Sequence, residues 1–198
     1  MLKKYLSPLL WSAAVLLVGF VVLDFAYFSF QTARVFDGKT TTYFSPGQKP
    51  SAPNLAPNQI AISDLAIHAP ILYPAKNSSG DYEAFLKLGV VHFPGTALPG
   101  AVGNCYIFGH SSDYIWVKGN YKTVFAPLTQ IAIGDTISVS NAAGQTFNYT
   151  VTKTFITSPN DLSVLSQQTN TKKLLTLQTS YPLGTALERF IVQAGMEN

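Results

Sequence analysis

Three residues whose side chains could do chemistry stand where apolar segments of the sequence end or begin. His110 follows the segment GNCYIFG, and Ser180 follows LLTLQT. Arg189 comes nine residues after Ser180 and opens the apolar run 190–194. Imidazole, hydroxyl and guanidinium groups are the kinds used for proton transfer, nucleophilic attack and anion binding. Because the connection 181–187 is rich in turn-forming residues, we expect a hairpin that returns Arg189 beside Ser180.

The remaining reactive residue types do not form a metal or disulfide site. Cys105 is the single cysteine, so neither an internal disulfide nor a thiolate-based zinc site can form. His68, His92 and His110 are separated by 24 and 18 residues, which matches no metal-ligand spacing. No acidic cluster indicates calcium. We therefore expect no metal and no other cofactor.

The elements that must position these residues are mostly short strands. Strand-like patterns occupy 58–63, 65–72, 136–139, 147–151, 173–179 and 189–194, and an apolar strand precedes His110. Helical patterns are confined to 82–88 and 123–130. Many short strands with frequent turn signals predict a mainly β domain, a closed barrel or sandwich, over 57–198.

The N-terminus predicts a membrane anchor. Residues 5–23 carry no charge, and at 1.5 Å per residue such a run can span a bilayer as a helix. Lys3 and Lys4 place residues 1–4 in the cytoplasm, and aromatic residues after Asp24 resemble an interfacial belt, so the anchor is assigned to 5–30. A cleaved signal peptide and a buried core helix are the alternatives.

The residues between anchor and domain read as a spacer. Segment 31–56 has little hydrophobic periodicity and contains three prolines, which favours an extended linker. We therefore expect a single-pass protein of the cell membrane with its 57–198 domain outside the cytoplasm. The net charge of +3 is small, and no basic stripe with interleaved aromatics is present, so nucleic acid is not an expected partner.

An ordered set of motifs resembles the sortase family. The strand-and-histidine segment GNCYIFGH, the segment LTLQTS followed by Tyr-Pro, and Arg189 occur in the order found in sortases. Further similarity to sortases is found in segments 89–100, 125–128 and 134–137. The resemblance thus extends over most of 57–198. The resemblance implies an eight-stranded sortase-type closed β-barrel with short helices. The GHSS segment and the residues after position 180 resemble the class D and E sortases.

The same resemblance implies a reaction and its site residues. The donor is a sorting-signal peptide of the L-P-x-T-G kind, cut through an acyl-enzyme, and the acceptor is an amine of a cell-wall precursor or a pilin lysine. By position, His110 is the acid/base residue, position 180 carries the nucleophile, and Arg189 donates hydrogen bonds to the substrate carbonyl or oxyanion. Thr179, beside the nucleophile, assists at the oxyanion.

Ser180 departs from the family pattern, which has a cysteine here. A hydroxyl is a far weaker acid than a thiol and needs a base during attack, so the activity of this form is expected to be low. Ser180 is either a natural replacement, a substitution introduced to trap substrate, or the nucleophile of a true serine transpeptidase. Alternatively, another residue is the nucleophile, and Cys105 is the only thiol in the sequence. Cys105 is, however, expected on the strand face opposite His110, as a small buried hydrophobe.

Two features bear on which of these functions the chain has. Asp113, Asp81 and Asp161 are loop carboxylates that could orient His110 for a serine mechanism, although solvated loop residues are the simpler interpretation. The leading hypothesis is a membrane-anchored transpeptidase or hydrolase of the sortase type. The alternatives are a catalytically inactive module that binds sorting signals, and a structural surface domain.

Overall fold

The computed structural model describes residues 54–75, 82–112 and 119–196, which all belong to one compact unit within 51–198. The predicted anchor at 5–30 and nearly all of the spacer at 31–56 lie outside these residues. In the described part of the chain, no helix is long and apolar enough to cross a membrane.

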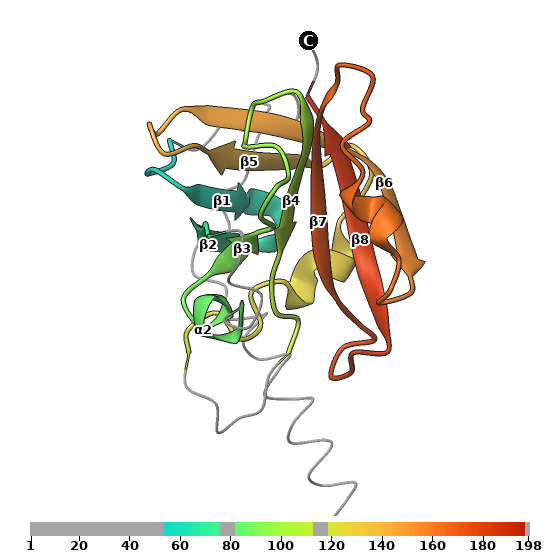
Figure 1. Cartoon of the computed structure of the whole chain (residues 1–198). Helices are drawn as coiled ribbons and strands as arrows, with labels where there is room; N and C mark the ends of the chain where they lie inside the picture. The colour runs from blue at the N-terminus through green and yellow to red at the C-terminus, as the bar shows by residue number, and fades with distance from the viewer. Residues whose placement is uncertain (1–53, 76–81, 113–118, 197–198) are drawn as a thin grey trace, which may run out of the picture. The chain divides into compact units, whose positions relative to one another are not determined.

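Eight strands close into a barrel, as the resemblance implied (Figure 1). Around the barrel the strands follow the order β1-β2-β3-β4-β7-β8-β6-β5. The strands are β1 (Gln59–Ile62), β2 (Ile67–Leu72), β3 (Val90–His92), β4 (Gly103–Phe108), β5 (Thr136–Ser140), β6 (Thr146–Thr157), β7 (Lys173–Tyr181) and β8 (Glu188–Gly195).

Short helices fill the connections. The predicted helix at 82–88 is present as α2 (Tyr82–Leu86), and the one at 123–130 as the 3-10 helix η2 (Ala126–Gln130). Two further 3-10 turns, η1 (Ser63–Leu65) and η3 (Leu162–Leu165), were not predicted. β6 extends six residues beyond the predicted alternation at 147–151, so that its second half pairs with β8.

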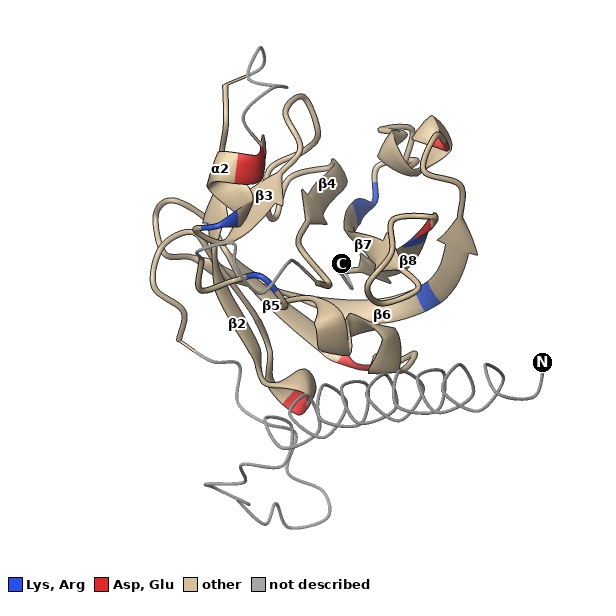
Figure 2. Cartoon of the chain, turned by 90° about the horizontal axis from the view of Figure 1, so that it is seen from below, with Lys and Arg blue, Asp and Glu red and all other residues tan. Residues whose placement is uncertain are grey.

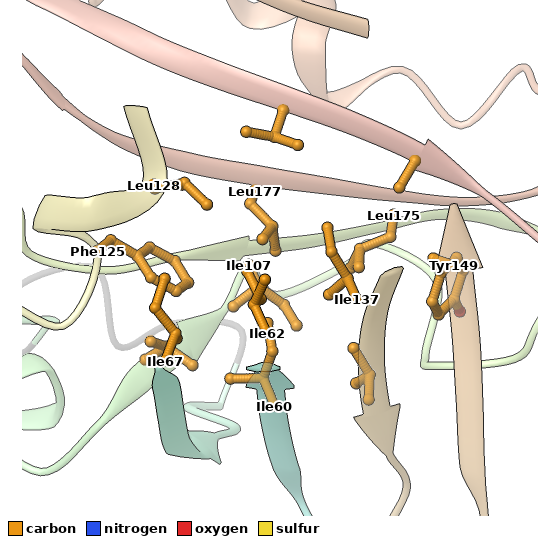
Figure 3. Close-up of a cluster of buried hydrophobic side chains, with 14 of the residues drawn as sticks. Ile60, Ile62, Ile67, Ile107, Phe125, Leu128, Ile137, Tyr149, Leu175 and Leu177 are labelled. Atoms are coloured by element: carbon orange, nitrogen blue, oxygen red, sulfur yellow. The ribbon is translucent and has the colours of Figure 1, made fainter. Parts of the chain in front are cut away.

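The barrel interior is packed with aliphatic and aromatic side chains from every strand (Figure 3). Side chains alternate between the two faces of a strand, so every second residue points inward. On the three strands that matter for the site, the inward residues are Cys105, Ile107, Leu175, Leu177, Val192 and Ala194. The intervening residues of these strands must therefore lie on the outer face.

A second, smaller apolar cluster covers part of that outer face. Its buried members are Tyr106, Val164 and Ile191, from β4, η3 and β8. Phe93, Phe108, Phe155 and Leu165 pack against them. The outer surface of β4 and β8 thus carries an apolar floor, which these seven residues form.

Candidate active site

Strand register places His110, Ser180 and Arg189 in one row. β4 runs parallel to β7 and ends with Phe108 opposite Gln178, and the Gly109 N–H donates to the Gln178 carbonyl at 3.1 Å. Two residues further along both strands, His110 therefore lies level with Ser180. β7 is antiparallel to β8 and pairs Ser180 with Arg189. The structure thus brings the three predicted residues together at neighbouring strand ends.

The three side chains share the outer face of the barrel. Side-chain alternation puts Ile107 and Leu177 inside, and therefore His110 and Ser180, each three residues further on, outside. Arg189 is likewise three residues from the inward-pointing Val192. An imidazole, a hydroxyl and a guanidinium therefore face the same side of three adjacent strands.

Glycine before the histidine is required by packing on the opposite face. A Cβ on Gly109 would lie 2.8 Å from Cδ2 of Phe125 and 3.0 Å from Cγ1 of Val90, both of which are fully buried. The Phe125 N–H also donates to the His110 carbonyl at 2.9 Å. The position of His110 is therefore tied to the tight contact between Gly109 and the Phe125 ring.

The imidazole of His110 is mostly covered and close to a carboxylate. The side chain of His110 is 19% exposed, and its Nε2 lies 3.8 Å from Oε2 of Glu83. Nε2 itself is buried and has no hydrogen-bond partner among the described residues. One ring nitrogen thus has an unmet hydrogen-bonding capacity and a carboxylate just out of bonding reach.

Ser180 and Arg189 are adjacent but not bonded to one another. Within the described ranges, Oγ of Ser180 makes no hydrogen bond, and Nη1 of Arg189 donates to the carbonyls of Ala186 and Glu188 at 3.0 Å each. A guanidinium has five N–H donors, so those on Nε and Nη2 are left for another acceptor. The loop before β8 therefore orients Arg189 without using up its donors.

Thr179 points to the other face of the sheet. Its side chain is buried, and Oγ1 donates to the Gly109 carbonyl at 2.9 Å. The hydroxyl is thus on the barrel interior, away from the row that contains Ser180. Instead of facing a substrate, it links β7 to the residue that precedes His110.

The carboxylates named from the sequence are not those that approach His110. Asp81 and Asp113 lie outside the described residues. Asp161 caps η3: its carboxylate accepts from the Ser163 hydroxyl, the Thr157 hydroxyl and the Ser163 N–H, in that order of importance for lowering its pKa. Glu83, on α2, was missed by sequence reasoning. No spacing rule links it to His110, because the contact joins elements 27 residues apart.

The other reactive residues have structural environments. Cys105 is fully buried on the interior face, where burial raises the pKa of its thiol to about 12, so the prediction of a small buried hydrophobe is confirmed. His92 is buried, its pKa is lowered by burial, and its Nε2 bonds the Ala97 carbonyl at 2.9 Å. His68 is exposed and bonds Gln59. In the described ranges, no group of three potential ligands could hold a metal ion.

Aromatic side chains form one wall beside the row. Tyr82 of α2 packs edge-on against Phe108, with 5.3 Å between ring centroids, and Phe93 contacts both Tyr82 and Tyr106. The Tyr106 hydroxyl donates to Oε1 of Gln178. Burial raises the pKa of Tyr106, and the positive charge of Arg189 opposes this rise. The Arg189 guanidinium is therefore close enough to interact electrostatically with Tyr106, a member of the aromatic wall.

The domain matches a known protein family. The sortase domain family matches residues 60–197. No curated protein is significantly similar to the chain.

Solved structures of sortases are similar over most of the domain. The sortase D5 transpeptidase of Clostridium perfringens is 28% identical, with a TM-score of 0.57 over 71% of this chain and 78% of that chain. Sortase C-1 of Actinomyces oris is 26% identical, with a TM-score of 0.58 over 71% and 72%. Sortase C of Clostridium perfringens, solved with the C-terminal cell wall sorting motif, is 25% identical, with a TM-score of 0.58 over 71% and 69%. The chain belongs to the sortase family.

Proposed function

We propose that this protein is a membrane-anchored sortase-type transpeptidase in which Ser180, His110 and Arg189 form the catalytic group. The observation that carries the proposal is the single row that these residues make across β4, β7 and β8. A nucleophile flanked by an acid/base residue and a cationic hydrogen-bond donor is the arrangement that acyl transfer requires. The apolar floor beside the row suits a largely apolar peptide segment.

The proposed reaction begins with an acyl-enzyme. Oγ of Ser180 attacks the threonine carbonyl carbon of an L-P-x-T-G-like signal, and its proton passes to His110. The carbonyl oxygen becomes an oxyanion, which Arg189 stabilises with its remaining donors. The carbon–nitrogen bond to glycine then breaks, and His110 gives the proton to the leaving amine. The product is an ester between Ser180 and the donor peptide.

The second half of the reaction transfers the acyl group. An amine, supplied by a cell-wall precursor or a pilin lysine, attacks the ester and loses a proton to His110. Ser180 regains that proton as the new amide leaves. If water replaces the amine, the same steps hydrolyse the signal.

Serine at position 180 is expected to make the first half slow. A thiol is already a few per cent thiolate near neutral pH, whereas a hydroxyl must lose its proton during attack. We expect Ser180→Cys to react faster with the same peptides. Thr179 is proposed to position the end of β4 through its bond to Gly109 rather than to face the oxyanion with its side chain.

We also propose a membrane anchor, an L-P-x-T-G-like donor peptide and a place near the class D and E sortases. The uncharged run at 5–23 supports an anchor that holds the barrel on the extracytoplasmic side of the cell membrane. A related sortase C has been solved with a cell wall sorting motif, which supports a peptide of this kind as donor. The similarity to a sortase D5 supports placing the chain near the class D and E sortases.

A catalytically inactive module that binds sorting signals is the second candidate. The observation in its favour is that Oγ of Ser180 has no hydrogen bond to a base among the described residues. Such a module would hold the peptide against the outer face of β7 without cutting it.

The two candidates differ in turnover. The full chain and its Ser180→Cys variant are incubated with a panel of L-P-x-T-G-like peptides and an amine acceptor, and the transfer product is quantified by liquid chromatography. The transpeptidase proposal predicts slow transfer by the unmodified chain and faster transfer by the cysteine variant. Peptide binding with no transfer by the unmodified chain, while the cysteine variant is active, would favour the binding module.

A further inference from the structure

We propose that Glu83 positions His110, so that Ser180, His110 and Glu83 form a relay suited to a hydroxyl nucleophile. The inference rests on the proposed function, because it concerns how the same site activates Ser180. It assigns a role to a residue of α2 that none of the sequence motifs contains.

The distance between the two groups supports this role. Oε2 of Glu83 lies 3.8 Å from Nε2 of His110, which is about 1 Å beyond the usual length of a charge-assisted hydrogen bond. The Glu83 side chain is 75% exposed, so most of it is in solvent and can adopt another staggered rotamer. Nε2 of His110 is buried and unpartnered in the described part of the chain, so it gains most from such a bond.

The helix that carries Glu83 is held against the strands of the site. Tyr82 contacts Phe93 with tilted rings and packs edge-on against Phe108, at centroid distances of 6.3 and 5.3 Å. Leu86 at the other end of α2 is buried. The backbone of Glu83 is therefore fixed relative to β3 and β4, and only its side chain has to move.

The order of elements puts His110 between Glu83 and Ser180. α2 lies beside β3, and β4 separates β3 from β7 (Figure 2). Because His110 lies two residues past the end of β4, the carboxylate approaches from the β3 side and the hydroxyl from the β7 side. One ring nitrogen can thus face the carboxylate while the other faces Ser180.

This arrangement supplies what a serine nucleophile needs and a thiolate does not. A carboxylate that accepts a hydrogen bond from Nε2–H holds the imidazole in the tautomer whose Nδ1 has a free lone pair. Nδ1 then takes the Ser180 proton during attack and later returns it to the leaving amine. Glu83 acts only through this hydrogen bond and receives no proton. A resting thiolate has already lost its proton, so attack by cysteine depends less on this tautomer.

The test compares Glu83→Gln in the Ser180 chain and in the Ser180→Cys chain. Both readouts are made on the full chain: kcat and KM with an L-P-x-T-G-like peptide, and the labelling rate of Ser180 by a fluorophosphonate, which needs an activated hydroxyl but no peptide. In the serine chain we expect Glu83→Gln to lower kcat and the labelling rate by about tenfold or more, with KM unchanged. In the cysteine chain we expect kcat to change by less than about threefold.

Two variants act as controls. Glu83→Asp keeps the carboxylate and should restore part of the labelling rate. Asp64→Asn removes the same charge from an exposed residue of η1 and should leave the rate unchanged. Thermal unfolding of each variant separates a positioning effect from loss of fold.

The outcomes also separate this inference from the proposed function. Suppose that both chains process peptide, but the fluorophosphonate labels Ser180 in the Glu83→Gln variant as fast as in the unmodified chain. The relay is then wrong and the transpeptidase proposal stands. If neither chain processes any peptide, the transpeptidase proposal fails, and slower labelling of Glu83→Gln still supports the relay. Failure of the fluorophosphonate to modify Ser180 in the unmodified chain overturns the relay.

Discussion

Replacing Gly109 by alanine tests whether interior packing sets the position of the catalytic histidine. Gly109 does not have a positive φ, so alanine can adopt its backbone conformation, and the effect is steric. The new methyl group would lie 2.8 Å from Cδ2 of Phe125, against the 3.4 Å at which ordinary contact begins. Cγ1 of Val90 would lie 3.0 Å from the same methyl group. Val90 is also fully buried, so its side chain cannot move into solvent.

The magnitude follows from these contacts. Overfilling a packed core by one methyl group costs about 1–3 kcal/mol of unfolding free energy. The Phe125 ring is the neighbour that must shift, and the Phe125 N–H is bonded to the His110 carbonyl. We therefore expect Gly109→Ala to destabilise the barrel by about 1–3 kcal/mol and also to slow peptide transfer, because His110 moves with Phe125.

The assay combines urea unfolding, followed by circular dichroism, with the transfer rate under folding conditions. Gly195→Ala is the matched control: it lies on β8, its Cβ would meet nothing closer than Cδ2 of Leu174 at 3.7 Å, and it should be neutral or stabilising by up to about 1 kcal/mol. Phe125→Leu should recover part of the loss in the Gly109→Ala background. Unchanged stability and unchanged transfer by Gly109→Ala would refute the reasoning.

Three further predictions concern the surroundings of the row. Thr179→Val removes the buried bond to the Gly109 carbonyl and should cost about 1–3 kcal/mol in urea unfolding; an unchanged midpoint would show that the bond contributes nothing. Cys105 should resist alkylation until the barrel unfolds, because burial raises the pKa of its thiol to about 12; rapid labelling of the folded chain would contradict its placement. Hydrogen bonds lower the pKa of Asp161, so their stabilisation is complete above the unfolded pKa of about 3.9 and is lost as pH falls through the folded value. Asp161→Asn should therefore flatten the acid side of the stability profile, and identical profiles below about pH 4 would exclude this contribution.

The fold and the row could be predicted because their signals are local in the sequence. Alternation along short segments identifies strands, and the motifs ending in His110 and Ser180 carry the resemblance that implies a barrel. His110 and Ser180 each follow an apolar segment and Arg189 precedes one, so their positions at strand ends can be read from the sequence. Cys105 could be placed on the opposite face from His110 by alternation alone, since the two are five residues apart.

Contacts between distant elements could not be predicted in this way. Glu83 lies 3.8 Å from His110 because Tyr82 packs α2 against Phe93 and Phe108, and no pattern in the sequence records that approach. Thr179 stands next to Ser180 in the chain, and the resemblance to sortases implied an oxyanion role for it. Strand alternation directs its side chain inward, where its hydroxyl donates a hydrogen bond to the Gly109 carbonyl.

Acyl transfer by this chain requires that residue 180 carry the nucleophilic atom that attacks the donor peptide. Intact-protein mass spectrometry of the Ser180→Cys chain, incubated with L-P-x-T-G-like peptides and no amine acceptor, measures this. We predict an added mass equal to the acyl part of the peptide, mapped by fragmentation to position 180 and greatly reduced by His110→Ala or Arg189→Ala. A folded cysteine variant that neither cuts any peptide of the panel nor gains this mass would contradict the account.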